Sequence, residues 1–346
     1  MRRNILLMAA AIISLLATSC LKQDNLQTQK TFVEGIPETK SVLVKSPKLH
    51  VYVETNDVNP LNALDYKVGN KQLIDVVELF AANIHKKTVE GEIQPVLYLN
   101  DKLTPVLANN AWRTNVIPLT RSGIKVLLTI LGDHQQIGLA NMNETQQKQF
   151  VNELLYAYYS YGLSGFGFDD EYADYNWLHP ANTTSYSGII DKLKNKDSQV
   201  LTSVFYWGHA NTLNASAKAN VDYFYHGNFT AWNTNPAGVD KSKWAPACWN
   251  MGYSGNSTID METLAEDAKA GGYGSLMFFN LRCRNEQGIV DPLLCFQAIA
   301  NGAYNGQTVT CSGGNRARVA PVSGGLDIDH ETAYNYLVAN NLPHFF

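Results

Sequence analysis

Eight short apolar segments, spread between residues 49 and 281, constrain the fold of this chain more than any other feature. They are rich in β-branched and aromatic residues, which favour strands, and turn-forming or polar residues separate them. The segments are residues 49–54, 74–84, 124–132, 165–171, 200–207, 221–229, 246–253 and 274–281. The sequence therefore predicts eight strands within one large domain.

Helix-like stretches lie between several of these strands, at residues 145–162, 185–196, 261–272 and 292–304. Strands that alternate with helices are typical of a parallel sheet, and eight such units predict an α/β fold of the (β/α)8 TIM-type barrel class. The link between the sixth and seventh strands looks too irregular for a full helix, so we expect some helices to be short or missing. The alternative is a doubly wound open sheet, but the chain has no glycine-rich phosphate loop.

The first residues indicate export. Residues 1–19 contain two arginines, an apolar run and small residues, as in a signal peptide, and the LATSC that ends at Cys20 resembles a lipobox. We predict a bacterial lipoprotein that is lipidated on Cys20 and anchored in a membrane, at the cell surface; an ordinary signal peptide with a chance cysteine is the alternative. Residues 20–47 read as a flexible tether, 48–304 as a catalytic barrel, and 305–346 as an extension that packs on it.

The composition is that of a folded protein, with 45% hydrophobic and 17% charged residues and a formal net charge of -4. A chain of this charge without a basic stripe is not expected to bind nucleic acid. Apart from Cys20 the cysteines are Cys248, Cys283, Cys295 and Cys311, with no CxxC pair and no histidine cluster. We therefore predict a monomer without a metal or cofactor. Buried thiols and one or two disulfides both remain open.

The fourth predicted strand ends in Asp169-Asp170-Glu171, and in a barrel the carboxyl ends of the strands face the active site. Residues two apart on a strand share a face, so Asp169 and Glu171 point the same way and Asp170 points into the opposite layer. Crowded carboxylates raise the pKa of one of them, which keeps a glutamic acid protonated near neutral pH. The pattern predicts a catalytic pair, with a solvated turn or a cation site as the alternative.

Two segments carry a specific resemblance. KVLLTILGDHQQIGLANM (125–142) and YGLSGFGFDDEYADY (161–175) resemble glycoside hydrolase family 18, and within it the endoglycosidase H and F group. The similarity extends over roughly residues 48–303. Members of that group cut the chitobiose core of N-linked glycans between its two N-acetylglucosamines. The resemblance implies an endo-β-N-acetylglucosaminidase that uses the 2-acetamido oxygen of its substrate as the nucleophile and retains configuration.

The resemblance also assigns roles. Glu171 takes the place of the acid that protonates the departing oxygen, and Asp169 that of the group that orients the acetamide. Two carboxylates of the family motif are replaced here, by Ser164 and Gly167. The second of them normally supports the residue at the Asp169 position through a shared proton. The alternative function is therefore a noncatalytic surface glycan-binding protein with a degenerate family 18 site.

Further residues near the predicted strand ends are candidates for substrate contact. The tyrosine pair that the family places near the acetamide aligns with residues 228 and 229, and other hydroxyls, amides and aromatic rings lie close by. The expected partners are N-linked glycans or glycoproteins, whose sugar rings stack on aromatic faces and bond to amides and hydroxyls. The candidates are Asn228, Tyr225, Tyr253, Asn280 and Trp249.

Overall fold

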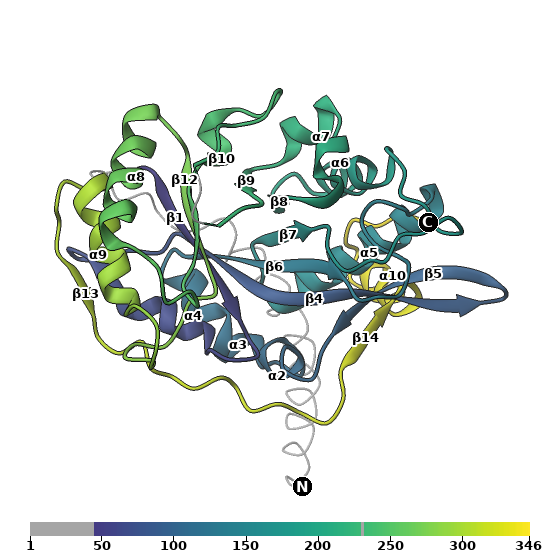
Figure 1. The fold of residues 1–346 in the computed structure, drawn as a ribbon. Helices are drawn as coiled ribbons and strands as arrows, with labels where there is room; N and C mark the ends of the chain where they lie inside the picture. The colour runs from purple at the N-terminus through teal and green to yellow at the C-terminus, as the bar shows by residue number, and fades with distance from the viewer. Residues whose placement is uncertain (1–44, 230–231) are drawn as a thin grey trace, which may run out of the picture. The chain divides into compact units, whose positions relative to one another are not determined.

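The computed structural model describes residues 45–229 and 232–346; the predictions for the signal peptide, for Cys20 and for the tether up to residue 44 lie outside them. The described chain forms a nearly closed barrel of parallel strands (Figure 1), which confirms the predicted fold class. Its strands are β1 (Lys48–Glu54), β4 (Val76–Val89), β6 (Lys125–Gly132), β7 (Gly165–Asp169), β8 (Leu201–Tyr206), β9 (Tyr223–His226), β10 (Trp244–Ala245), β11 (Cys248–Asn250) and β12 (Ser275–Phe279).

The order of the strands excludes the doubly wound alternative. Around the barrel they follow β10-β9-β8-β7-β6-β4-β1-β12-β11, so strands that are consecutive in the predicted alternation are neighbours throughout. An open doubly wound sheet would instead reverse its order at a switch point. The last full strand, β12, pairs with β1, with Lys48 opposite Ser275, and this pairing joins the eighth strand of the alternation to the first.

The seventh strand differs from the prediction because it is divided in two. β10 pairs with β9, whereas β11 pairs with β12, so the two halves close the barrel from opposite sides. Pro246 lies between them, and a proline has no N–H to donate to a ladder. The carbonyl of Ala247 still accepts a hydrogen bond from the Met277 N–H at 3.3 Å.

All four predicted helices are present, as α5 (Glu144–Tyr161), α6 (Ser185–Lys196), α8 (Thr258–Gly271) and α9 (Pro292–Ala303). Asn143 and Gln146 form a capping box at the start of α5, and Gly162 ends it in a left-handed conformation. α7 (Ala215–Asn220) is short. In its described residues, the link from β9 to β10 contains only a 3-10 turn, η3 (Lys241–Lys243), which is the irregularity that the sequence predicts.

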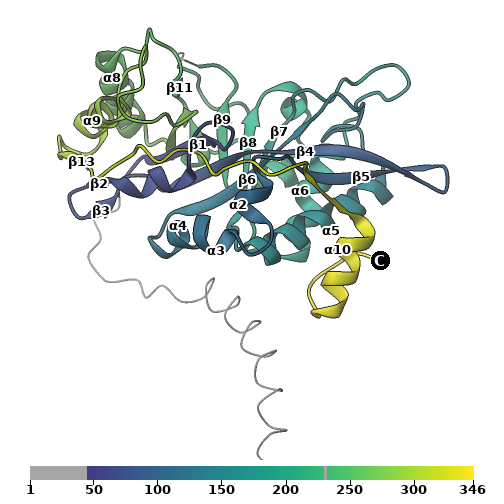
Figure 2. The ribbon, with the colours of Figure 1, turned by 90° about the horizontal axis from the view of Figure 1, so that it is seen from below.

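Several further elements add to the predicted barrel strands and the four helices. β4 runs on beyond the barrel and forms a hairpin with β5 (Glu92–Leu99), on which β14 (Leu326–Asp329) adds an antiparallel strand (Figures 1 and 2). α10 (His330–Ala339) then packs on α5 and buries Ala333 and Leu337. The other elements are η1 (Pro60–Asp65), β2 (Tyr66–Val68), β3 (Lys71–Gln72), α2 (Thr104–Leu107), α3 (Trp112–Asn115), α4 (Ile117–Arg121), η2 (Gly208–Thr212) and β13 (Val309–Cys311).

Two buried clusters fill the molecule. The larger lies between the barrel and its helices and includes Phe166 and Phe168 of β7. The smaller belongs to the opposite face of the strands, with Tyr52, Tyr225 and Met277 among its buried members. Because side chains alternate along a strand, this second cluster fills the barrel interior, next to the inward-facing residues of β7.

Candidate active site

The end of β7 places Asp169 inside the barrel. Phe168 belongs to the outer core, where its ring meets Tyr186 of α6 edge-on at 6.3 Å, so its neighbours on the strand face inward. Asp169 is only 4% exposed. Its Oδ1 is buried and accepts no hydrogen bond from the described part of the chain. A buried carboxylate oxygen without a donor is costly, which marks this position as a functional one.

Glu171 is half-buried and follows β7 by two residues. Its backbone is fixed by the end of β6, because its carbonyl accepts from the Gly132 N–H at 3.0 Å and the next carbonyl, that of Tyr172, accepts from His134 at 2.6 Å. A Cβ on Gly132 would lie 2.6 Å from the Cα of Ala173, so this close approach requires glycine. Strand β6 therefore holds the segment that carries Glu171.

Asp170 points away from the barrel interior, as the alternation along the strand predicts. Its Oδ1 accepts from the Tyr175 hydroxyl at 2.5 Å, and its Oδ2 accepts from the backbone N–H of His209 at 2.9 Å. The Nδ1 of His209 lies 2.7 Å from the same Oδ2. These bonds tie the segment after β7 to the segment after β8. Asp170 thus anchors the chain between Asp169 and Glu171.

The site electrostatics favour protonated carboxylic acids. Burial raises the pKa of Asp169 well above its usual range, and the carboxylates of Glu171 and Asp170 raise it further. Burial and Asp170 also raise the pKa of Glu171. Both carboxyl groups therefore tend to keep a proton at pH values where an exposed one is ionised, which suits Glu171 to general acid catalysis.

Glu78 of β4 is a fully buried carboxylate in the same barrel interior. Its Oε1 accepts from the hydroxyls of Ser203 at 2.5 Å and Tyr225 at 3.1 Å, and its Oε2 accepts from Thr129 at 3.1 Å. A Cβ added to Gly167 would overlap this Oε2. The space in front of Gly167 is therefore already filled by an acidic group from another strand.

The predicted substrate contacts separate into two groups. Asn228 and Tyr253 are exposed, Tyr253 to 50%, and Asn280 is half-buried with its Oδ1 accepting from Arg282 at 3.0 Å. These three follow strands β9, β11 and β12 at their carboxyl ends, where a barrel binds its ligand. Their roles stay predictions.

Tyr225 and Trp249 do not lie at the mouth. The hydroxyl of Tyr225 is committed to the interior, where it donates to Glu78 and lies 2.8 Å from Nδ1 of His50. Trp249 is 3% exposed and stacks on Phe278 in the core between barrel and helices. The alternation along β11 turns Trp249 outward, so its position does not support the predicted stacking on a sugar.

Exposed aromatic side chains follow three of the strands. Tyr172 (54% exposed) and Trp177 (85%) come after β7, Trp207 (49%) after β8, and Tyr253 after β11. The sequence prediction included only Tyr253 in its set of substrate contacts. Since the flat face of an aromatic ring can stack on a sugar and these rings follow strands at their carboxyl ends, they are candidates for sugar stacking.

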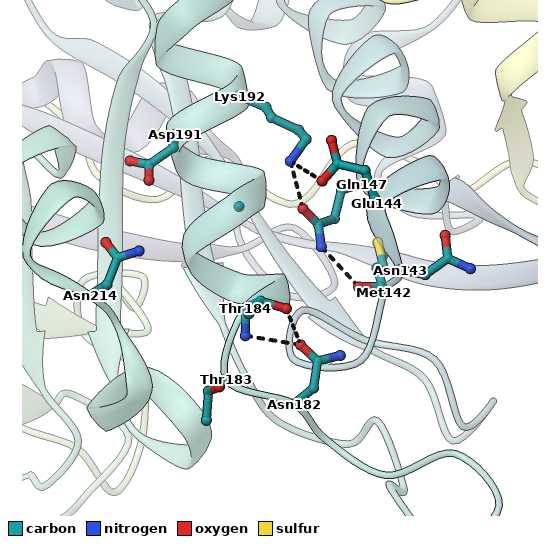
Figure 3. Close-up of a pocket in the computed structure, with 11 residues that line it drawn as sticks. Met142, Asn143, Glu144, Gln147, Asn182, Thr183, Thr184, Asp191, Lys192 and Asn214 are labelled. Atoms are coloured by element: carbon teal, nitrogen blue, oxygen red, sulfur yellow. Dashed lines mark hydrogen bonds and ion pairs between the residues drawn. The ribbon is translucent and has the colours of Figure 1, made fainter.

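A hollow of about 530 Å³ lies outside the barrel, beside the start of α5 and along α6 (Figure 3). Lys192 donates to the side-chain oxygen of Gln147 at 2.8 Å and pairs with Glu144 at 2.8 Å. Gln147 in turn donates to the carbonyl of Met142 at 2.9 Å. Several of the polar groups drawn there bond to one another, and neither Asp169 nor Glu171 lines the hollow, so we do not assign the catalytic site to it.

Over residues 45–229 and 232–346, no group of three or more histidine, cysteine or acidic side chains is arranged to hold a metal ion. The four cysteines in this range, Cys248, Cys283, Cys295 and Cys311, are free thiols. Of the helices in the same part of the chain, none has the length and apolar character needed to cross a bilayer.

Comparison with known proteins identifies the family. An endo-β-N-acetylglucosaminidase of Flavobacterium sp. (strain SK1022) is 32% identical over 246 residues, which are 68% of this chain and 75% of that relative. The chain belongs to the endo-β-N-acetylglucosaminidases. Endo-β-N-acetylglucosaminidase F1 of Elizabethkingia meningoseptica is 26% identical over 310 residues, 84% of this chain and 89% of that protein. The resemblance to the endoglycosidase H and F group of family 18 is thereby confirmed.

The chain is also similar to a solved structure that holds a glycan. EndoBT-3987 of Bacteroides thetaiotaomicron matches with a TM-score of 0.62 and 26% identity, both as a complex with Man5GlcNAc product and as a complex with Man9GlcNAc2Asn substrate. The matches cover 80% of this chain, and 63% and 68% of the chains in the two complexes. No protein-family model matches the chain.

Sequence reasoning did not single out Glu78. The signal was a carboxylate in the middle of the strand-like run IDVVELFAANI, with apolar residues on both sides of it, at a position where a barrel strand faces the interior. A charged group in such a run is rare without a partner or a function. What it faces, however, depends on strands β6 to β9, which the sequence alone does not place against it.

Proposed function

We propose that this chain hydrolyses the glycosidic bond between the two N-acetylglucosamines of an N-linked glycan. The observation that carries the proposal is the pair formed by buried Asp169 and half-buried Glu171 at the carboxyl end of a barrel strand. Two relatives of the chain are endo-β-N-acetylglucosaminidases, and the similar protein EndoBT-3987 has been solved with a Man9GlcNAc2Asn substrate.

The carboxyl groups of Glu171 and Asp169 have different roles in the proposed reaction. In the first step the acetamido carbonyl oxygen of the substrate attacks C1, the glycosidic C1–O bond breaks, and Glu171 transfers its proton to the departing oxygen. Positive charge then develops on the acetamide nitrogen. The buried, donor-free Oδ1 of Asp169 suits it to accept the N–H and to stabilise that charge. In the second step Glu171 takes a proton from water, which adds to C1, so configuration is retained.

The test uses the purified full chain in mild detergent, incubated with Man9GlcNAc2Asn and with glycoproteins that carry hybrid or complex glycans. The expected product is a free glycan with a single N-acetylglucosamine at its reducing end, detected by mass spectrometry. The matched control is Glu171→Gln, which keeps the size of the side chain but has no proton to give. It should bind the glycan and release it at a rate lower by about 10² to 10⁴-fold. Release at the wild-type rate would remove Glu171 from its role.

The alternative, a glycan-binding protein without turnover, rests on the two replaced motif residues. Ser164 has a structural role, since its hydroxyl oxygen accepts from the Val126 N–H at 3.1 Å, and Gly167 faces the carboxylate of Glu78. The substitution at 167 therefore does not leave the barrel interior without an acid. Binding of every glycan class with no release by the wild type would favour the alternative.

We further propose that the chain is exported as a monomeric lipoprotein, and that it contacts a membrane only through a lipid on Cys20. The support is the sequence of residues 1–20, an apolar run that ends in a lipobox-like LATSC. Expression with a radiolabelled fatty acid tests this proposal. The wild type should become labelled and partition with membranes, whereas Cys20→Ser should do neither. Unlabelled wild type would contradict the lipid anchor.

A further inference from the structure

A second hollow lies at the rim of the barrel mouth. It has a volume of about 170 Å³ and is formed mainly by the β4–β5 hairpin, the segment that follows β6 and the turn that follows β7. The hairpin contributes Lys86 and Ile93, the segment after β6 contributes Gln136, and the turn contributes Leu178 and His179. We call this feature the rim hollow.

The rim hollow belongs to the same loops as the candidate active site. The segment after β6 runs beside the one that carries Glu171, because the Gly132 N–H donates to the carbonyl of Glu171 and the His134 N–H to that of Tyr172. Both loops follow strands at their carboxyl ends, where a barrel binds its ligand. The outer part of a glycan that is bound at Glu171 can therefore extend over these loops.

The walls of the rim hollow are joined by hydrogen bonds within the protein. Asn141 donates to the carbonyls of Gln136 at 2.9 Å and His179 at 3.4 Å, so it links the segment after β6 to the turn after β7. Gln146 of α5 donates to the carbonyl of Ile93 at 2.8 Å and so holds the hairpin. Walls that are fixed in this way lose little conformational freedom when a ligand binds.

Three polar side chains of the rim hollow are available to a ligand. Within residues 45–229 and 232–346, the side chains of Lys86, Gln136 and His179 form no hydrogen bond or ion pair. They offer ammonium donors, an amide that both donates and accepts, and an imidazole. Such a set suits hydroxyl groups, each of which also donates and accepts. Among the described residues no carboxylate lines the hollow, so its wall does not favour a cationic ligand.

The turn after β7 adds apolar surface to these polar groups. Leu178 lines the hollow and is 61% exposed, and Trp177, the residue before it, is 85% exposed. Asn176 closes the turn, because its side-chain oxygen accepts from the N–H of Leu178 at 2.9 Å and from that of His179 at 3.1 Å. A hexose has hydroxyl groups around its edge and C–H groups on its faces, so it matches a polar wall beside an exposed indole.

The same two loops contain strained backbone. His134 and Gln136 after β6 have φ values of 55° and 63°, and Tyr172 and Asp174 after β7 have values of 57° and 54°. Residues other than glycine adopt this left-handed conformation at a cost, and such residues cluster at ligand-binding sites. Their grouping in the loops of the rim hollow agrees with a binding role for these loops.

We propose that the rim hollow is a subsite for one neutral hexose of an outer glycan branch, with Gln136 and His179 bonding to its hydroxyl groups and Trp177 beside its ring. The volume of about 170 Å³ is below the roughly 300 to 1,000 Å³ of pockets for drug-sized ligands, which suits a single sugar residue. Mannose and galactose share this chemistry, since both are uncharged rings edged with hydroxyl groups. The proposal rests on the proposed function, because it adds a subsite for a substrate of that same hydrolysis.

Three variants test the proposal: Trp177→Ala, His179→Ala and, as the matched control, His344→Ala. His344 is half-buried like His179 but lies in the C-terminal segment after α10, away from the rim hollow. Kinetic constants are measured on three asparagine-linked substrates, which are Man9GlcNAc2Asn, a biantennary glycan that ends in galactose, and the unbranched GlcNAc2Asn core. Circular dichroism shows that each variant folds.

We expect Trp177→Ala and His179→Ala to raise KM about tenfold for the branched substrate whose outer hexose occupies the hollow, with kcat within twofold of the wild type. The contacts lie away from the reacting bond, so they are equal in the ground state and the transition state and act on KM. The constants for the unbranched core should not change, and His344→Ala should match the wild type on all three substrates. A rise for Man9GlcNAc2Asn assigns mannose to the hollow, and a rise for the other branched substrate assigns galactose.

An active enzyme in which neither variant changes KM for a branched substrate would overturn the proposal and leave the proposed function intact. An equal rise of KM for the unbranched core would also overturn it, since the residues would then act on the chitobiose itself. If the wild type releases no glycan, the proposed function fails, and NMR still tests the hollow. The indole N–H signal of Trp177, assigned by its loss in Trp177→Ala, should shift when mannotriose or lactose is added, and should shift less in His179→Ala. No shift with either sugar would overturn the subsite.

Discussion

The substitution Glu78→Gln has a consequence for stability that is independent of catalysis. The pKa of Glu78 rises from an ordinary value of 4.5 to about 7 on folding, because the group is buried. Between these pH values the unfolded chain has released the proton that the native protein still holds. The free energy of unfolding of the wild type therefore falls as the pH rises through this window, and the contribution of Glu78 is constant below and above it.

The magnitude follows from the same two values. Each pH unit between pH 4.5 and about 7 is worth 1.36 kcal/mol, so ionisation of Glu78 removes about 3 kcal/mol of stability by pH 8. Glutamine does not titrate and keeps the hydrogen bonds to Ser203, Tyr225 and Thr129. The variant should therefore match the wild type near pH 4.5, within about 1 kcal/mol, and exceed it at pH 8.

Urea unfolding of both proteins at half-unit intervals from pH 4.5 to 8, followed by circular dichroism, measures this difference. Comparing the two proteins at each pH removes the contribution of the other titrating groups, apart from any that Glu78 itself perturbs. Glu266→Gln, on an exposed position of α8, is the control and should run parallel to the wild type. Parallel curves for Glu78→Gln and the wild type would refute the reasoning, since Glu78 would then have a similar pKa in both states.

Three further predictions concern other parts of the molecule. Asp169→Asn should slow the single-turnover rate by about 10² to 10³-fold and weaken glycan binding far less, because the charge acts in the transition state; an unchanged chemical rate would exclude this role. Gly132→Ala should lower kcat and destabilise the fold by about 1 to 3 kcal/mol, since the new Cβ would lie 2.6 Å from the backbone of Ala173, next to Glu171; activity and melting temperature at wild-type levels would contradict it. Leu337→Ala, fully buried on α10, should cost about 2 to 5 kcal/mol of stability and leave kcat unchanged below the melting temperature, and thermal unfolding checks both expectations.

Local patterns were sufficient for much of the fold and for the central carboxylates. The predicted strands and helices follow from runs of apolar residues and from capping signals, both of which depend on neighbours in the sequence. The placement of Asp169 and Glu171 on one side, with Asp170 on the other, needs only the two-residue repeat of a strand. Even the irregular link after β9 could be anticipated, because its residues lack a helical period.

The tertiary structure decided the matters that depend on distant parts of the chain. It divided the seventh strand at Pro246, added β14 to the β4–β5 hairpin, and turned Trp249 into the outer core. It also brought Glu78 to Gly167 and to Ser203, which lies 125 residues further along the chain than Glu78. A run of apolar residues indicates that a strand is buried. Which groups meet inside the barrel depends on how the barrel closes and on the register of its strands. These are set by all eight strands together, which is why the acid of β4 and the glycine of β7 could be matched only in three dimensions.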